Sequence, residues 1–143
     1  MIDSFRGENQ FLSNFYDYFM YFEGKFYKNS EAAFQAQKCI KEEYKNNFST
    51  LSARDSKILG KQVELREDWE EVKDEIMYNV VKEKFRTINM ARLLLATGEQ
   101  ELVEGNSWGD TYWGKCDGRG KNKLGHILMK VRQELATLGN QNG

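Results

Sequence analysis

The chain has 143 residues, of which 40% are hydrophobic and 30% charged, a mix typical of one globular domain and not of a disordered chain. Its 21 basic and 22 acidic residues give a formal net charge of −1, which argues against a surface that binds nucleic acid by overall positive charge. The sequence contains no apolar run long enough to cross a bilayer and no signal peptide. We therefore expect a cytoplasmic protein without a membrane partner, with reduced thiols at Cys39 and Cys116.

Aromatic residues crowd the first thirty positions, which favours short strands over a helix. Glu23-Gly24-Lys25 separates two aromatic runs and predicts a β-hairpin there. Ser30 is a typical N-cap, and the residues that follow predict a helix over 31–40.

Further helices are predicted from cap signals and apolar spacing. Ser52 and Asp55 form a capping pattern for a helix that starts at Ala53 and is closed by Gly60. Apolar residues spaced at helical intervals predict the next helix, which starts at Trp69. A helix over 90–96 and a short strand over 102–104 follow.

The last helix is predicted from Lys123, with Asn122 as its cap and Gly139 at its end. Its core-facing stripe consists of Leu124, Ile127, Leu128, Val131, Leu135 and Leu138. The fold class is therefore α+β, a mostly helical single domain over 1–143 with a core over about 5–138 and a frayed tail over 139–143. Four or five helices would pack around a small antiparallel sheet supplied by the N-terminal strands and the Trp-rich segment.

Glu31 and Lys38 are the first candidates for chemistry. Seven residues are two helical turns, so both side chains would leave one face of the predicted helix, beside Phe34. An apolar neighbourhood raises a carboxyl pKa and lowers a lysine pKa, as acid–base and Schiff-base chemistry require. The alternative is an ordinary pair of surface charges.

The second candidate is the segment Trp108-Gly109-Asp110-Thr111-Tyr112-Trp113-Gly114. Its indole rings suit stacking on a base or a sugar, and its glycines allow a ligand close to the backbone. Asp110 would hold a ribose hydroxyl or activate water. The alternative is two core tryptophans and a turn aspartate.

The third candidate is the glycine-rich loop over 118–122, which leads into the last helix. Glycines and basic residues before a helix N-terminus suit a phosphate, although the spacing matches neither a Walker A nor a Rossmann motif. The alternative is an ordinary capped loop. The single histidine, His126, argues against zinc sites that need two, and we expect neither a metal nor a cofactor.

Four motifs in order resemble the NADAR domain, also called the YbiA-like N-glycosidase family. They are Phe11-Leu12-Ser13-Asn14-Phe15-Tyr16; Ser30-Glu31-Ala32-Ala33-Phe34-Gln35-Ala36-Gln37-Lys38; Trp108-Gly109-Asp110 with Trp113-Gly114; and Gly120-Lys121-Asn122-Lys123-Leu124-Gly125 with Leu128-Met129-Lys130-Val131-Arg132. The resemblance extends from about Phe5 to Leu135.

The resemblance implies a hydrolase that cuts the bond between ribose C1 and an amine. Two substrates are associated with such proteins: ADP-ribose linked to the guanine amino group, and the phosphoribosylamino-pyrimidine intermediates of riboflavin synthesis. The implied partners are thus a ribose-phosphate or ADP-ribosyl substrate, ADP-ribosylated DNA or RNA, and a cognate ADP-ribosyltransferase toxin.

Within that resemblance, Glu31 is the expected acid–base residue and Asp110 orients the ribose or water. Lys38 captures the opened ribose as a Schiff base or neutralises phosphate. The expected substrate-binding residues are Arg6, Asn14, Phe15, Trp108, Trp113, Gly114 and Asn122. We expect the Glu31 helix to meet the Trp108 loop at one pocket. The alternative function is a non-catalytic module that binds ADP-ribose or an NAD derivative without needing Glu31.

Overall fold

The structure is a computed structural model that describes the backbone of residues 1–142 and the side chains of residues 1–139. The chain forms two compact units. The middle unit is Asn14–Lys84, and the terminal unit combines Met1–Ser13 with Phe85–Gly143. Each is described by itself. Among the described residues, no helix is both long and apolar enough to span a bilayer.

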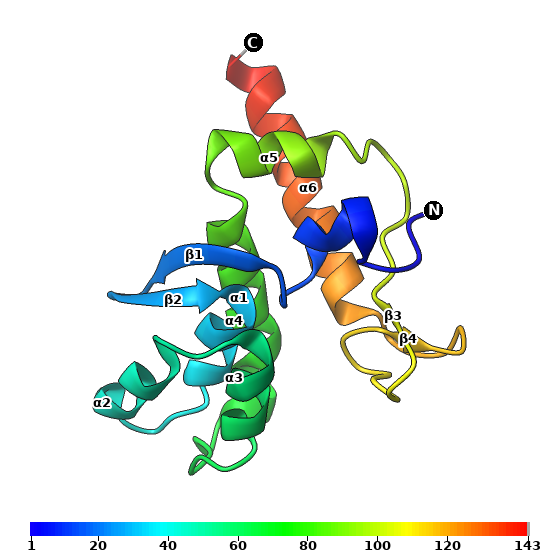
Figure 1. Cartoon of the computed structure of the whole chain (residues 1–143). Coiled ribbons are helices and arrows are strands. Elements are labelled where there is room, and N and C mark those ends of the chain that lie inside the picture. Colours follow the sequence, from blue (N-terminus) through cyan, green and yellow to red (C-terminus); the bar gives the residue numbers. More distant parts are fainter. Residues whose placement is uncertain (143) are drawn as a thin grey trace. The chain divides into compact units, whose positions relative to one another are not determined.

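The middle unit contains a hairpin followed by helices (Figure 1). Its elements are β1 (Asp17–Phe22), β2 (Lys25–Asn29), α1 (Ser30–Ala36), α2 (Glu42–Lys45), the 3-10 helix η2 (Asn46–Phe48), α3 (Ala53–Gly60) and α4 (Trp69–Lys84). The strands β1 and β2 are antiparallel, and β1 packs against α1 and α4. Glu23 and Gly24 both have positive φ at the turn, so the predicted hairpin is confirmed.

Helix α1 is shorter than the predicted helix over 31–40 and begins at a different cap. The Asn29 side chain, not Ser30, accepts the Ala32 N–H at 2.7 Å. After Ala36 the N–H groups of Gln37, Lys38 and Cys39 bond to carbonyls three residues back, because the chain tightens before it pairs with the segment at Leu65. Lys38 therefore lies just beyond the helix and not two regular turns along it.

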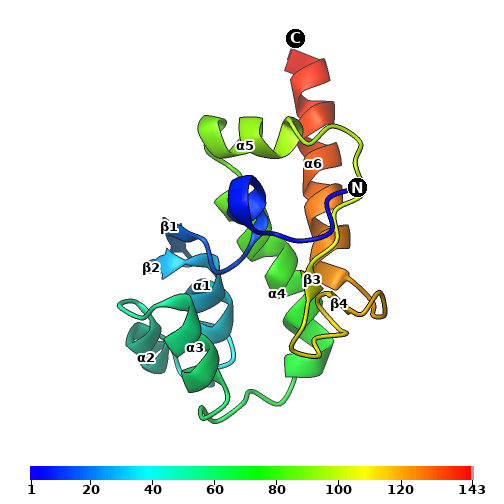
Figure 2. The same cartoon turned by 45° about the vertical axis from the view of Figure 1, so that its right-hand side comes forward.

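Two other helices of this unit follow their predicted starts. The Ser52 hydroxyl accepts the Asp55 N–H at 3.1 Å and caps α3, which lies beside α1 (Figure 2). Gly60 is the last residue of α3 and not a residue beyond it. Helix α4 starts at Trp69 as predicted, but Lys84 is buried at its end while Val72 and Ile76 are only partly covered.

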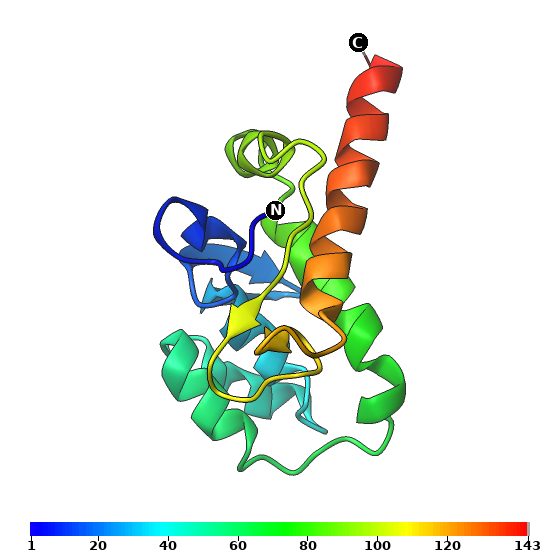
Figure 3. The same cartoon turned by 90° about the vertical axis from the view of Figure 1, so that its right-hand side faces the viewer.

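The terminal unit contains the 3-10 helix η1 (Gly7–Leu12), α5 (Ile88–Leu95), β3 (Gly105–Asn106), β4 (Lys115–Cys116) and the long helix α6 (Lys123–Asn142) (Figure 3). Helix α5 packs on α6, and Phe11 meets the edge of Phe85 with ring centroids 6.4 Å apart. With α5 and α6, the described residues form six α-helices and not four or five.

Three predictions for this unit are wrong in detail. β3 and β4, on either side of the Trp-rich segment, form a separate parallel pair and do not join an antiparallel sheet with β1. The expected strand over 102–104 reduces to a bridge between Leu102 and Ile2. Helix α5 also starts two residues before the predicted 90–96.

The predicted end of the last helix is also wrong. Helix α6 continues through Gly139 to Asn142, and Leu138 is 54% exposed instead of packed in the core. A Cβ atom added to Gly139 would meet nothing within 4 Å, and Gly139 lacks the positive φ of a closing glycine, so it does not end the helix. Of the predicted frayed tail, only Gly143 lies outside the described residues.

Candidate functional site

Asn14 fixes the start of α1 and so places Glu31. The Glu31 N–H donates to the Asn14 carbonyl at 3.0 Å, and the Ser30 hydroxyl donates to Asn14 Oδ1 at 3.0 Å. Asn14 is itself buried, with Nδ2 3.3 Å from the Met77 sulfur. Asn14, a predicted binding residue, therefore holds the loop before β1 against the first residues of α1 through these hydrogen bonds.

Glu31 is a buried carboxylate held by an amide. Its side chain is 8% exposed, and Gln35 Nε2 donates to Glu31 Oε1 at 2.9 Å. The other end of that amide, Gln35 Oε1, is buried and has no partner among the described residues. A Cβ atom added to Gly60 would lie 2.0 Å from Gln35 Oε1, so only glycine allows this packing. The sequence had indicated Gly60 only as a helix end, because nothing local links it to Gln35.

The Lys38 ammonium lies near the same glycine, Gly60. Lys38 Nζ is 3.5 Å from the Gly60 carbonyl oxygen and 5.7 Å from the centroid of the Trp69 ring. Burial lowers the pKa of Lys38, the Glu31 charge partly opposes that shift, and the positive charges of Lys61, Lys73 and Lys57 lower the pKa further. A lysine of this kind has a larger share of the neutral, nucleophilic amine near neutral pH than an ordinary lysine.

An aromatic wall stands beside Lys38. Trp69 is buried, and its ring lies 5.2 Å from the Phe34 ring, centroid to centroid, at 52°. The sequence predicts Trp69 only as the start of a helix, because none of its sequence neighbours indicates a functional site. The Trp69 ring attracts the Lys38 ammonium and also shields it from water.

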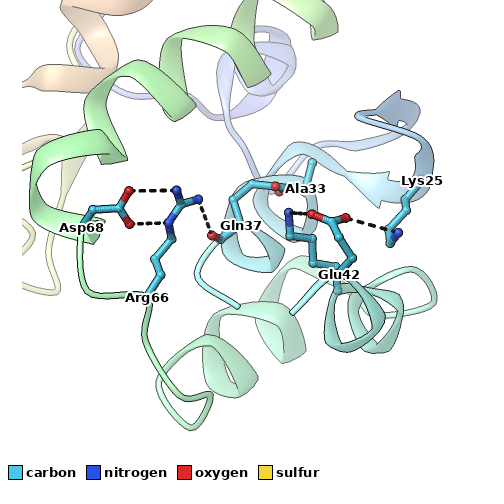
Figure 4. A network of polar contacts seen from close by, with 7 residues as sticks. Lys25, Ala33, Gln37, Glu42, Arg66 and Asp68 are labelled. Atoms are coloured by element: carbon cyan, nitrogen blue, oxygen red, sulfur yellow. Dashed lines mark hydrogen bonds and ion pairs between the residues drawn. The ribbon is translucent and has the colours of Figure 1, made fainter. Parts of the chain in front are cut away.

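Arg66 clamps the backbone that carries Lys38 (Figure 4). Its guanidinium forms a bidentate pair with Asp68, at 2.6 and 3.0 Å, and also donates to the Gln37 carbonyl at 3.4 Å. The Arg66 N–H donates to the Lys38 carbonyl at 3.0 Å. The backbone at Lys38 is therefore held in place by Arg66, although Lys38 lies outside the helix.

In the terminal unit, Asp110 organises the Trp-rich segment. Asp110 Oδ1 accepts hydrogen bonds from the N–H groups of Tyr112 and Trp113 at 3.1 and 3.0 Å. The Asn106 side chain donates to the Asp110 carbonyl at 2.8 Å and accepts from the Asp110 N–H at 3.0 Å. The Trp113 ring meets Tyr112 edge-on at 4.8 Å, centroid to centroid. Trp108 is 56% exposed, so more than half of this residue is accessible to solvent.

Gly114 and Asn122 connect the Trp-rich segment and the loop after it to residues 102–104. A Cβ atom on Gly114 would lie 2.1 Å from the Glu104 carbonyl oxygen, which makes glycine necessary at this close approach. Asn122 is fully buried with a φ of 51°. Asn122 Oδ1 accepts the Glu104 N–H at 3.0 Å and Nδ2 donates to the Leu102 carbonyl at 2.9 Å, so its side chain links two loops instead of capping α6.

The remaining predicted binding residues, Arg6 and Phe15, are exposed. Lys57 Nζ lies 6.0 Å from the centroid of the Phe15 ring. Of the predicted site, the middle unit holds Asn14, Phe15, Glu31 and Lys38; the terminal unit holds Arg6, Trp108, Asp110, Trp113, Gly114 and Asn122. The expected meeting of the Glu31 helix with the Trp108 loop stays a prediction. Among the described residues, no group of three or more His, Cys, Asp or Glu side chains is placed to hold a metal ion.

The fold matches a known structure closely. An NMR structure of YbiA from Escherichia coli superposes with a TM-score of 0.83 at 34% identity, covering 97% of this chain and 89% of that one. The predicted class, mostly helical α+β with small sheets, is thereby confirmed.

Sequence comparisons agree. The chain is 38% identical over 132 residues to the N-glycosidase YbiA of Escherichia coli, covering 87% of this chain and 81% of the relative. It is 33% identical over 135 residues to the N-glycosidase Npun_R5314 of Nostoc punctiforme, covering 89% and 86%. It is also 39% identical over 132 residues to the riboflavin biosynthesis protein VVA0006 of Vibrio vulnificus, covering 87% of this chain and 35% of that longer protein.

A profile of the NADAR domain matches residues 4–136. The chain therefore belongs to the NADAR domain family, and the resemblance seen in the four sequence motifs is confirmed. Its relatives of the YbiA type place it among the N-glycosidases, which are hydrolases of N-glycosyl bonds.

Proposed function

We propose that the protein hydrolyses the bond between ribose C1 and the nitrogen of an amine, with Glu31 as acid–base residue and Lys38 as nucleophile. The observation that carries this proposal is the pairing of a buried carboxylate with a lysine of lowered pKa in one unit. Cleavage needs a proton moved to and from the reacting atoms, and a group that stabilises the electron-poor C1.

In the proposed reaction, the ribosylamine opens to an imine as the ring oxygen takes a proton. Lys38 Nζ adds to C1, the C1–N bond to the leaving amine breaks, and Glu31 returns the proton to the leaving nitrogen. Water then hydrolyses the imine between C1 and Lys38. One water is consumed, and the free amine and the free ribose are released.

The substrate is one of two ribosylamines. The name of the Vibrio relative supports a phosphoribosylamino-pyrimidine of riboflavin synthesis. The exposed Trp108 supports a stacked base or adenine, as in ADP-ribose linked to guanine in DNA or RNA. Initial rates on both substrates, measured side by side, distinguish these. A toxin partner and a cytoplasmic location stay predictions.

Borohydride trapping tests the mechanism. We expect a reduced ribosyl adduct on the wild-type protein, identified by mass, and none on Lys38→Ala. If Lys38→Ala is trapped as well as the wild type, the Schiff base is wrong and Lys38 acts only as a cation. Glu31→Gln should lower kcat by about 10²–10⁴, and an unchanged kcat would remove the acid–base role.

The role of Asp110 has its own test. Asp110→Asn keeps an oxygen that accepts the Tyr112 and Trp113 N–H groups, whereas Asp110→Ala removes it. If the charge of Asp110 acts on ribose or water, both variants lose activity. If Asp110 only holds the turn, Asp110→Asn stays active.

The alternative function, a module that binds ADP-ribose without cleaving it, predicts a different outcome. Such a protein would bind ADP-ribose tightly, release no base from either substrate, and keep its affinity in Glu31→Gln. The buried Glu31 carboxylate in one unit with a lysine of lowered pKa supports the enzyme over this alternative.

A further inference from the structure

The Gln35 amide is a buried partner of the proposed acid–base residue. Gln35 and Glu31 are four residues apart in α1, which places their side chains next to each other on one side of the helix. Gln35 Nε2 donates to Glu31 Oε1 at 2.9 Å, and both residues are buried. On an exposed helix such a contact is weak. Away from water, a donor on a carboxylate forms a charge-assisted bond that favours the ionised form of the acid.

Packing alone does not explain an amide at this position. Gln35 Oε1 is buried and has no hydrogen-bond partner among the described residues. The amide lies against α3, where a Cβ atom added to Gly60 would clash with Oε1 and lie 2.8 Å from the Gln35 Cδ atom. An unpaired amide oxygen in the interior lowers stability. An apolar side chain of similar length would fill the same space without that cost, so the donor half of the amide is the part that has a role.

The amide nitrogen, and not the oxygen, faces Glu31, as an ionised carboxylate requires. The oxygens of an ionised carboxylate only accept hydrogen bonds. If the amide were turned by half a rotation, two acceptor oxygens would face each other. Gln35 therefore stabilises the carboxylate through its N–H, and it does so from a position that α3 fixes.

We propose that Gln35 is a positioning residue of the reaction, whose amide orients the Glu31 carboxylate and sets the pH at which that carboxylate takes up a proton. This inference rests on the proposed function, in which Glu31 moves the proton. Asn14 fixes the other end of the acid, because its carbonyl accepts the Glu31 N–H at 3.0 Å. The backbone and the carboxylate of Glu31 are thus held by separate residues, and only Gln35 acts on the group that reacts.

Two substitutions of similar size distinguish this role from a structural one. Gln35→Met fills the space without a donor, so Glu31 should take up a proton about 1 pH unit higher than in the wild type. Gln35→Glu places a second carboxyl group beside Glu31, so the pair should titrate in two steps and keep its last proton to higher pH. The matched control is Gln37→Met. Gln37 is also a buried glutamine, but its Nε2 donates to the Ala33 carbonyl at 2.9 Å.

Carbon NMR of glutamate labelled at Cδ measures these titrations without any turnover. The Glu31 signal is assigned by its absence from Glu31→Gln. We expect its midpoint to rise in Gln35→Met and to keep the wild-type value in Gln37→Met. Equal midpoints in the wild type and Gln35→Met, or the same rise in Gln37→Met, overturn the inference.

A kinetic arm separates this inference from the proposed function. The limb of the pH profile of kcat that Glu31→Gln abolishes should move by the same 1 pH unit or so in Gln35→Met, with KM changed less than kcat. If the wild type cleaves a ribosylamine but this limb stays in place, only the positioning role is wrong. If the wild type cleaves neither ribosylamine but the NMR midpoint depends on Gln35, the proposed function fails and the pairing of Gln35 with Glu31 holds.

Discussion

Because Gly60 has no side chain, the Gln35 amide can lie against it and bond to Glu31. The Gln35 amide lies directly against the Gly60 backbone, and from there it donates to Glu31. The carboxylate is thus oriented by a residue one turn along its own helix, and that residue is in turn held by a glycine on another helix. This packing holds the Gln35 amide at hydrogen-bond distance from the Glu31 carboxylate.

Gly60→Ala should displace Gln35 and so free Glu31. We expect the free energy of unfolding to fall by about 1–3 kcal/mol, as for other overpacked sites, and kcat to fall with it. The matched control is Gly139→Ala, where a methyl group meets nothing within 4 Å and should stabilise α6 by about 0.5–1 kcal/mol. Urea unfolding of both variants checks this, and equal stabilisation by both would show that Gln35 moves without cost.

The pKa of Lys38 predicts a pH effect of defined sign. The Glu31 carboxylate raises this pKa against the lowering by burial. Removing that charge in Glu31→Gln should lower the pKa further, so the amine becomes reactive at lower pH. The pH midpoint of Lys38 labelling by an amine reagent measures this directly. A midpoint that stays unchanged would show that Glu31 is not charged beside Lys38.

At the scale of elements, helix α4 ends on an unusual residue. Lys84 is 1% exposed, its ammonium lies 5.7 Å from the centroid of the Tyr16 ring, and burial lowers its pKa from 10.5 to about 7. Between these two values the folded protein holds Lys84 neutral, while the unfolded chain holds it protonated. Unfolding therefore takes up a proton in this range, and stability rises with pH.

Lys84→Met should remove this dependence. In the wild type, Lys84 contributes a rise of about 1.4 kcal/mol per pH unit above pH 7. The variant should be more stable at pH 7 and should lack this part of the slope up to pH 9.5. Urea unfolding at several pH values measures both. Equal slopes in the two proteins would mean that Lys84 stays charged in the fold.

The segment before α6 is held in place by the buried side chain of Asn122. Asn122→Ala loses one buried and one part-buried hydrogen bond and forces alanine to a φ of 51°, so we expect the free energy of unfolding to fall by about 2–4 kcal/mol. Asn122→Gly loses the same bonds without the backbone strain and should be about 1 kcal/mol less destabilised. Thermal unfolding compares the two, and equal stability would show that the backbone relaxes.

At the scale of the molecule, the two chain ends build one unit and the middle of the chain builds the other. The link between the ends is made by backbone bonds, with the Ile2 N–H donating to Glu101 and the Val103 N–H donating to Ile2 at 2.9 and 2.8 Å. The proposed acid and nucleophile belong to the middle unit, and the Trp-rich segment belongs to the terminal one. Neither unit alone holds every residue of the predicted site.

The formal net charge of −1 predicts weak binding to unmodified DNA. The affinity should depend on salt much less steeply than the log–log slope of about −10 of a strongly basic DNA-binding protein. A strand that carries ADP-ribose on guanine should bind more tightly than the bare strand at the same salt. Salt titrations of both strands check this, and a steep slope on bare DNA would instead favour a plain nucleic-acid-binding module.

Local patterns in the sequence were sufficient for the elements whose causes are local. The hairpin turn at Glu23-Gly24, the Ser52 cap and the start of α4 all depend on residues within one turn of one another. The end of α1 could not be predicted in this way, because the chain leaves the helix to pair with a segment more than twenty residues away. Lys38 consequently lies beyond the helix, although it still interacts with Glu31.

The sequence by itself thus determined the family, the class of chemistry and the local elements, since motif order and short-range periodicity carry that information. The tertiary structure alone decided that Gly60 lies against Gln35, that burial lowers the pKa of Lys38, and that Lys84 is buried. These features depend on side chains brought together from distant segments, where burial and neighbouring charge, and not residue type, determine what a group can do.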